Sequence, residues 1–272
     1  MAGILKDSPQ HAAQKRGEWG TRMSLSGNGF SHCGDRPFDK RYPCVRIAEI
    51  YPSIQGEGLL TGEPSTFVRA SGCNLRCWFC DTPHASWNPE GEDLSVAEIL
   101  GRIELLEVRN VVLTGGEPML FAEMIPLCEG IRRSGRHITI ETAGTLHLPL
   151  PCDLMSISPK LSNSTPNAQE FPRWHRRHEQ SRDQPEVIQR LIDEFPYQFK
   201  FVIDKREDCD EVLTYLGRFP GILRDRVYVM PQGIEQTQLD SITQWLTPWS
   251  EEHGLQLCYR KQIEWFGFAR GT

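Results

Sequence analysis

Apolar and polar residues alternate along two early segments of the chain. Residues 44–54, CVRIAEIYPSI, and residues 65–70, STFVRA, alternate with the period of a β-strand. The Gly-rich stretch QGEGLLTGEP between them predicts a turn. The two segments are therefore expected to form a pair of strands that encloses a loop.

Strands and helices alternate along the rest of the chain. Residues 94–107 have helical spacing with Ser95 as the cap, and NVVLT is a short buried strand that ends at Gly115 and Gly116. Further helices are predicted near residues 121–133, 186–194, 207–218 and 236–246, and further strands at HITIE, LMSIS, QFKFVI, RVYVM and LQLCY. About six such units predict an α/β fold, a partial (β/α)6 barrel, with ligands at the carboxyl ends of its strands.

Two segments do not follow this alternation. Residues 1–43 are rich in Gly, Ser, Arg and Pro without apolar periodicity, which predicts a flexible N-terminal extension. Residues 161–184 are polar and basic, which predicts a surface insert. Residues 44–272 are expected to form one domain that carries this insert near residues 161–184.

Composition and charge exclude several classes of function. The chain has 272 residues, of which 39% are hydrophobic and 24% charged, as in an ordinary globular protein. Its formal net charge of -6 argues against a broad surface for nucleic acid or anionic membranes. No run approaches the roughly 18 apolar residues of a membrane span, and the N-terminus has no secretory apolar core. A cytoplasmic location is expected.

Three of the nine cysteines are clustered in the stretch GCNLRCWFCDT. Cys73, Cys77 and Cys80 have the spacing C-x3-C-x2-C, so each could bind one iron of a 4Fe-4S cluster and leave one iron open. An open position is typical of a catalytic metal centre. The other six are expected to be small buried hydrophobes without a chemical role: Cys33, Cys44, Cys128, Cys152, Cys209 and Cys258.

An alternative is a zinc site in which His84 completes a Cys3His set. The chain would then be a zinc-stabilised adaptor that binds a partner through its basic insert. Zinc modules usually present their ligands as two separated pairs, however, and a zinc site would not explain the Gly-rich strand ends downstream.

The cysteine loop and a later motif resemble those of the radical S-adenosylmethionine (SAM) family. CNLRCWFC resembles the signature loop and TGGEP, residues 114–118, the second motif. The resemblance implies that SAM chelates the open iron and is cleaved to a 5'-deoxyadenosyl radical. Gly115 and Gly116 would let the backbone approach SAM closely, and Glu117 would accept from its amino group. The other residues expected to bind SAM are Phe79, Asp81, Ser158, Pro159 and Lys160.

Within that family, the stretch from EIYPSIQGEG to CDT resembles the 7-carboxy-7-deazaguanine synthases, as do VVLTGGEP, IETAGT and ISPK. The resemblance implies conversion of 6-carboxy-5,6,7,8-tetrahydropterin to 7-carboxy-7-deazaguanine with loss of ammonia, SAM and magnesium being required. Arg69 would hold the substrate carboxylate, Glu57 would act beside it, and Thr82 would bind magnesium. The residues implied to contact the substrate are Ile54, Gln55, Gly56, Arg69 and Thr114.

The resemblance also implies a flavodoxin or ferredoxin as reductant and a homodimer. The C-terminal stretch LCYRKQIEWFGFARGT departs from the family pattern, because Gln262 stands where many members have a His. A glycyl-radical activating enzyme is the enzymatic alternative, since it shares the cysteine loop but would need neither the IQGEG stretch nor Arg69.

Overall fold

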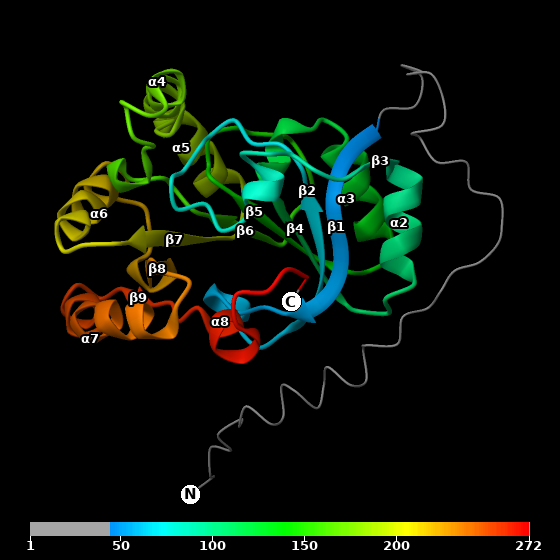
Figure 1. Cartoon of the computed structure of the whole chain (residues 1–272). Helices are drawn as coiled ribbons and strands as arrows, with labels where there is room; N and C mark the ends of the chain where they lie inside the picture. Colours follow the sequence, from blue (N-terminus) through cyan, green and yellow to red (C-terminus); the bar gives the residue numbers. More distant parts are fainter. Residues whose placement is uncertain (1–43, 272) are drawn as a thin grey trace, which may run out of the picture.

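A nine-stranded sheet is the framework of the computed structural model, which describes residues 44–271 (Figure 1). The expected N-terminal extension, residues 1–43, lies outside the described residues. The strands are β1 (Cys44–Ile54), β2 (Pro64–Ala70), β3 (Glu92–Ser95), β4 (Asn110–Gly115), β5 (His137–Thr142), β6 (Leu154–Ile157), β7 (Tyr197–Ile203), β8 (Val227–Pro231) and β9 (Gln256–Leu257). Their order in the sheet is β3-β1-β2-β4-β5-β6-β7-β8-β9.

The sheet has an antiparallel edge and a long parallel part. Strand β1 pairs antiparallel with β2 and with β3, and from β2 to β9 every neighbouring pair is parallel. The predicted strand pair and the predicted parallel sheet are both confirmed. Strand β3 was not expected, and β9 is shorter than the predicted LQLCY strand.

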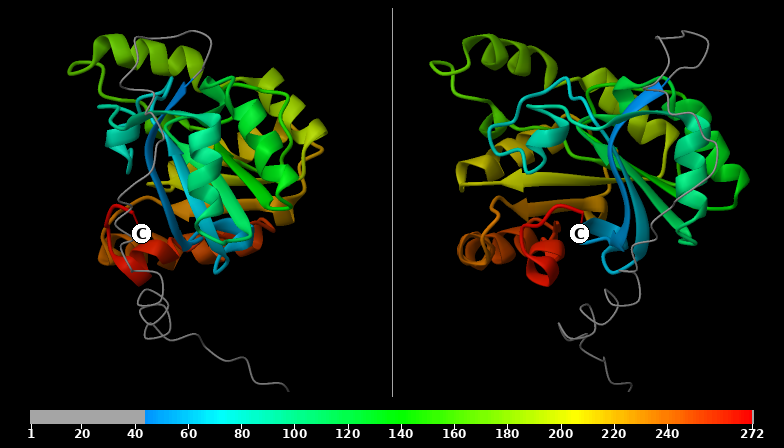
Figure 2. Two further views of the ribbon diagram at one scale, coloured as in Figure 1. Left: turned by 90° about the vertical axis from the view of Figure 1, so that its right-hand side faces the viewer. Right: turned by 45° about the vertical axis from the view of Figure 1, so that its right-hand side comes forward.

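Helices follow the parallel strands and lie around the outside of the curved sheet (Figure 2). They are α2 (Val96–Glu104), α3 (Met124–Arg133), α4 (Pro172–Ser181), α5 (Pro185–Glu194), α6 (Glu207–Gly217), α7 (Gln236–Glu252) and α8 (Lys261–Phe266). Ser95 caps α2 as predicted, in a capping box with Glu98. Helix α7 extends beyond the predicted range, and α8 was not predicted. A curved parallel sheet with outer helices agrees with a partial barrel.

The two faces of the parallel strands bury different side chains, because successive residues of a strand point to opposite faces. On β7, Phe199 and Phe201 are fully buried in the main hydrophobic core. The alternate residues Gln198 and Lys200 are also buried, but they are polar and face other polar groups. The inner face of the curved sheet is therefore polar. The outer face packs into the main hydrophobic core.

Most of the scattered cysteines match the expectation of small buried hydrophobes. Cys128, Cys152, Cys209 and Cys258 are buried and have free thiols. Cys44 is disulfide-bonded, so the expectation is wrong for this residue. Cys33 lies outside the described residues. Within residues 44–271, no helix has the length and apolarity needed to cross a membrane.

Candidate active site

The carboxyl ends of the parallel strands surround a cavity of about 730 Å³. Most of the side chains predicted from the sequence line it. They are Ile54, Gln55, Gly56, Glu57, Arg69, Cys73, Cys77, Phe79, Cys80, Asp81, Thr82, Thr114, Gly116, Ser158 and Lys160. Glu117 and Pro159 are buried and do not line the cavity. The sequence motifs thus come together at the carboxyl ends of the strands.

The loop after β2 carries three free thiols into this cavity. Cys73, Cys77 and Cys80 lie in a small apolar cluster with Leu75 and Ala143, and no fourth cysteine of the described residues lines the cavity. Burial raises the pKa of the Cys73 and Cys77 thiols to about 12. A bound metal reverses this preference, since a coordinating thiol is deprotonated. The donor set fits a 4Fe-4S cluster with one open iron.

The same loop does not form a site for a single metal ion. Among the described residues, no three Cys, His, Asp or Glu side chains come together around one point. His84 lines the cavity, and its Nε2 lies 3.5 Å from Oε1 of Glu49. The predicted alternative of a Cys3His zinc site therefore finds no support in this geometry.

Gly115 and Gly116 let β4 pack closely against the cysteine loop. A Cβ atom on Gly115, where φ is +134°, would lie 2.0 Å from the carbonyl oxygen of Ala70. A Cβ on Gly116 would lie 2.1 Å from the oxygen of Gly72 and 2.5 Å from that of Ala85. The glycines are thus required for backbone packing around the cysteine loop, whereas the sequence suggested close approach to a ligand.

The Glu117 carboxylate lies just behind the cavity wall and bonds to the ends of neighbouring strands. The side chain is fully buried. One oxygen accepts from Met119 N at 3.1 Å and from Thr142 Oγ1 at 2.8 Å, and the other accepts from Ala143 N at 2.8 Å. Burial raises its pKa, and these hydrogen bonds oppose the rise. These hydrogen bonds fix two strand ends, and Oε2, with a single donor among the described residues, keeps capacity to accept another hydrogen bond.

Lys160 is held at the edge of the cavity by its own loop. Its ammonium group donates to the carbonyl oxygen of Ser158 at 2.6 Å and to Ser158 Oγ at 2.8 Å. An ammonium group has three donors, so one remains for a ligand. The buried Pro159 lies between the two residues and keeps this short loop in place.

A buried chain of charges crosses the floor of the cavity. The Lys200 ammonium lies 3.0 Å from Oε2 of Glu57 and 2.8 Å from Oε1 of Glu141. The other oxygen of Glu141 accepts from Thr114 Oγ1 at 2.8 Å. Burial alone would raise the pKa of Glu57, but Lys200 and Arg260 lower it to about 2. Burial alone would lower the pKa of Lys200, but Glu141 and Glu57 raise it.

Sequence reasoning missed Lys200 as a member of the site. The available signal was a lysine at an interior position of the apolar strand QFKFVI, where an unpaired charge would be unfavourable. Glu141 was noted only as part of a strand-end motif. Its pairing with Lys200, 59 positions along the chain, is visible only in the folded protein.

Arg69 is oriented by two neighbours from β1. Its Nε donates to Oε1 of Glu49 at 2.6 Å, and one terminal nitrogen donates to the Tyr51 hydroxyl at 2.9 Å. Burial would lower the pKa of Arg69, but Tyr51 and Glu49 raise it, so the guanidinium stays charged. Neither of these bonds uses the second terminal nitrogen, and Arg69 lines the cavity wall.

The C-terminal segment closes one side of the cavity. Arg260 lies 2.6 Å from Asp81 of the cysteine loop, and Gln262 Nε2 donates to Oε1 of Glu57 at 2.5 Å. Lys261 N donates to the carbonyl oxygen of Gly56 at 3.0 Å. Residues 267–271 also line the cavity. The only feature of this segment noted from the sequence was Gln262, which stands where many family members have a His.

Comparison with known proteins identifies the class. A family model described as the radical SAM superfamily matches residues 67–204, about half of the chain. The crystal structure of QueE from Escherichia coli has the same fold, with a TM-score of 0.61 and 21% identity over 79% of this chain and 93% of that one. The chain belongs to the radical SAM superfamily, whose members use a 4Fe-4S cluster and SAM.

Two curated relatives identify the family within this class. A 7-carboxy-7-deazaguanine synthase of Rhodopirellula baltica is 44% identical over 89% of this chain and 95% of its own. One of Halobacterium salinarum is 38% identical over 85% of this chain and 93% of its own. The chain belongs to the 7-carboxy-7-deazaguanine synthase family. The alternatives of a glycyl-radical activating enzyme and of a zinc adaptor are thereby wrong.

Proposed function

We propose that this chain converts 6-carboxy-5,6,7,8-tetrahydropterin to 7-carboxy-7-deazaguanine and releases ammonia, as a carbon–nitrogen lyase of queuosine and 7-deazapurine biosynthesis. Family membership supports this reaction. The observation that carries it in the structure is that three free thiols and the guanidinium of Arg69 line one cavity. A cluster, SAM and a carboxylated substrate can therefore meet in one place.

Cys73, Cys77 and Cys80 would hold the cluster. Together, the cluster and SAM would supply a 5'-deoxyadenosyl radical that removes hydrogen from the substrate. The third N–H group of the Lys160 ammonium would donate a hydrogen bond to SAM. The cavity-lining residues Phe79, Asp81, Gly116 and Ser158 would surround the SAM molecule. The apolar side chains around the thiols, Leu75 and Ala143 among them, would keep water from the radical.

Arg69 would bind the substrate carboxylate through the edge of its guanidinium that Glu49 and Tyr51 leave open. Gln55 donates to Ser65 Oγ at 2.8 Å, which orients its amide oxygen for a pterin N–H group. Glu57 is ionised at neutral pH, since its pKa is about 2. A carboxylate of such low pKa is a poor general base. Glu57 would therefore accept hydrogen bonds from the pterin and hold the substrate in place.

The remaining substrate contacts would come from Ile54, Gly56 and Thr114, which line the same wall. Thr82 would be the protein ligand of Mg²⁺, since a hydroxyl with water and substrate oxygens suits that ion. We further propose a flavodoxin or ferredoxin as reductant, a homodimer and a cytoplasmic location. Residues 44–272 would be one radical SAM domain, with a polar insert near residues 161–184.

Product analysis tests this function. The reconstituted protein is incubated without oxygen with reductant, SAM, Mg²⁺ and the carboxylated pterin, and 7-carboxy-7-deazaguanine and ammonia are measured. Cys77→Ala should abolish SAM cleavage. Arg69→Ala should retain the cluster and SAM binding but lose most turnover of the pterin. Absence of the product from a protein that carries a full cluster and cleaves SAM would reject the proposed substrate.

A further inference from the structure

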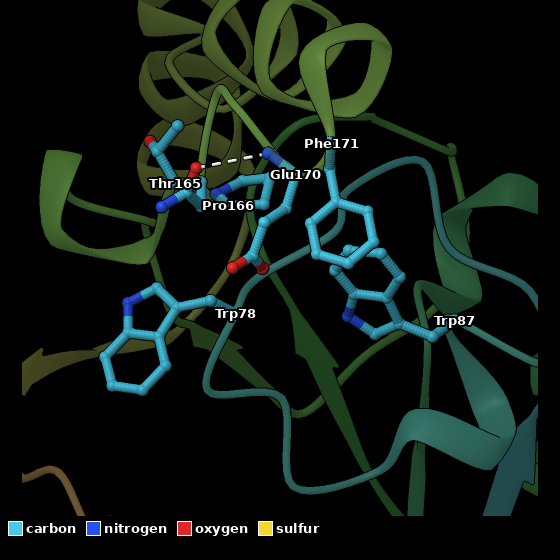
Figure 3. A pocket seen from close by; sticks show the side chains of 7 residues that line it. Trp78, Trp87, Thr165, Pro166, Glu170 and Phe171 are labelled. Carbon is cyan, nitrogen blue, oxygen red and sulfur yellow. Dashed lines mark hydrogen bonds between the residues drawn. The ribbon is translucent and has the colours of Figure 1, made fainter.

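A second cavity of about 610 Å³ lies on the outer side of the cysteine loop (Figure 3). Three of its seven lining residues are aromatic: Trp78 and Trp87 come from the cysteine loop and the segment after it, and Phe171 comes from the insert. The rings of Trp87 and Phe171 meet edge to face, with centroids 5.0 Å apart. Trp78 is 52% exposed and Phe171 40%. Large exposed aromatic residues around a cavity are typical of an interaction site.

This aromatic cavity shares its backbone with the predicted cluster ligands. Trp78 directly follows Cys77, and Trp87 Nε1 donates to the carbonyl oxygen of Cys77 at 2.9 Å. The indole of Trp78 donates to Asn163 O at 2.7 Å, and its amide donates to Ser164 O at 3.1 Å. The cavity is therefore the place where the cysteine loop reaches the protein surface.

Helix α4, which begins directly after Phe171, carries a cluster of positive charge next to this cavity. Arg173, Arg176 and Arg177 are exposed, and within residues 44–271 no carboxylate forms an ion pair with them. Arg173 and Arg176 are three residues apart and so lie on one face of the helix. Glu170 is the one carboxylate among the residues that line the cavity. This basic face stands out on a chain whose formal net charge is -6.

Several contacts hold the insert rigidly on the cysteine loop. The guanidinium of Arg76 lies over the ring of Trp174 at 4.1 Å. Arg76 N donates to Nδ1 of His178 at 3.1 Å, and the other nitrogen of that ring lies 2.9 Å from Ser164 Oγ. The basic face and the aromatic cavity are thus one preformed surface, and we call it the α4 surface.

We propose that the α4 surface is the docking site of an acidic flavodoxin that reduces the cluster. The exposed edge of a flavin is flat and aromatic, and it matches the walls formed by Trp78, Trp87 and Phe171. Its acidic surface would face the arginines of α4. One electron passes from the flavin hydroquinone to the oxidised 4Fe-4S cluster, which leaves a flavin semiquinone and a reduced cluster. Complexes that transfer electrons are small, so one helix and one cavity suffice as an interface.

This inference rests on the proposed function only in requiring a reducible cluster, and it is tested without the pterin. Binding of oxidised flavodoxin to the cluster-loaded protein is measured by calorimetry, and reduction of the cluster by flavodoxin hydroquinone is followed by stopped-flow absorbance. The test variant is Arg173→Glu/Arg176→Glu. The matched control is Arg109→Glu/Arg133→Glu, which reverses two exposed arginines near the amino ends of β4 and β5.

The test variant should slow cluster reduction by flavodoxin about tenfold at low salt, and the difference should shrink as salt screens the charges. Dithionite, which needs no docking site, should reduce both variants at the wild-type rate. Glu170→Gln should strengthen flavodoxin binding, because it removes the acidic group from the rim. A charge reversal on α4 that affects flavodoxin no more than the control does would overturn the proposal.

Two other outcomes would also overturn it. One is that a ferredoxin reduces the cluster faster than flavodoxin does, at a rate that the α4 substitutions do not change. The aromatic walls would then have no role in electron delivery. The other is binding of transfer RNA to α4 that flavodoxin does not displace. If dithionite failed to reduce the test variant, the Glu170→Gln variant would decide whether flavodoxin docks on the α4 surface. Unchanged or weaker binding of flavodoxin to Glu170→Gln would count against docking there. Failure of the pterin assay with dithionite would instead reject the proposed substrate.

Discussion

The ammonium of Lys200 lies 3.0 Å from the carboxylate of Glu57, and this contact joins strand β7 to the loop between β1 and β2. The two residues are 143 positions apart. Lys200 also pairs with Glu141 on β5, so one buried cation links three segments at the carboxyl ends of the strands. Lys200 therefore holds together the strand ends that form the substrate side of the cavity.

Removal of that charge should destabilise the protein strongly. Lys200→Met leaves Glu141 without its cation and Glu57 with only its longer contact to Arg260, and breaking a buried pair in this way costs about 4 kcal/mol. Unfolding in urea of the cluster-loaded protein measures the loss. Lys205→Met, at an exposed lysine just beyond the same strand, should change the free energy of unfolding by less than about 0.5 kcal/mol. Equal midpoints for the two variants would contradict the role of Lys200.

The same contacts predict a dependence of stability on acid. The pKa of Glu57 is about 2 in the folded protein and 4.5 without its partners, so the unfolded state binds more protons between these values. Its contribution, about 3 kcal/mol, is complete above pH 4.5 and is lost as the pH falls through 2. Glu57→Gln should flatten the decline in stability below pH 5, whereas Glu104→Gln, at an exposed site on α2, should leave the wild-type slope. A slope unchanged by Glu57→Gln would show that Glu57 is not held ionised.

The strands of the parallel sheet were predictable because each is a short apolar run ended by Gly, Pro or polar residues. Strand β3 was missed because its four residues, EDLS, have no apolar pattern and form a strand only through pairing with β1. Helix α8 was missed for a similar reason. At six residues it is too short to be stable alone, and it forms where residues 261–262 pack on Gly56.

The site was predictable where the chemistry lies in local motifs. Cys73, Cys77 and Cys80 were found from their spacing, and Arg69 from the resemblance of the surrounding stretch. Local patterns could not show that the Glu117 carboxylate faces Thr142 and Ala143, since that depends on how β4 and β5 are paired.

Gly56 should tolerate no larger residue. A Cβ atom there would lie 2.2 Å from Oε1 and 2.5 Å from the backbone nitrogen of Gln262, so Gly56→Ala must displace the C-terminal segment. Such a displacement can reduce turnover on the order of 100-fold. Hydrogen exchange at residues 260–271 should become faster in this variant. Gly101→Ala, in open space on α2, should instead stabilise the protein by about 0.5–1 kcal/mol and keep full activity.

His178 should make the attachment of the insert sensitive to pH. Burial lowers its pKa to about 4, so the ring is neutral at pH 7 and its Nδ1 accepts from Arg76 N. The value without burial is 6.5, and the unfolded state therefore binds more protons between pH 4 and 6.5. Stability from this group is complete above pH 6.5 and falls as the pH drops toward 4.

The insert should consequently loosen in mild acid before the sheet unfolds. A proton on Nδ1 removes the acceptor for Arg76 N in the cysteine loop, whereas the strands are held by the hydrophobic core. Hydrogen exchange of residues 161–184, corrected for the intrinsic rate, should increase from pH 7 to pH 5 in the wild type. His178→Asn keeps an acceptor near the same position and cannot be protonated, so its exchange should change little with pH. An equal acid response in both proteins would assign the loosening to another group.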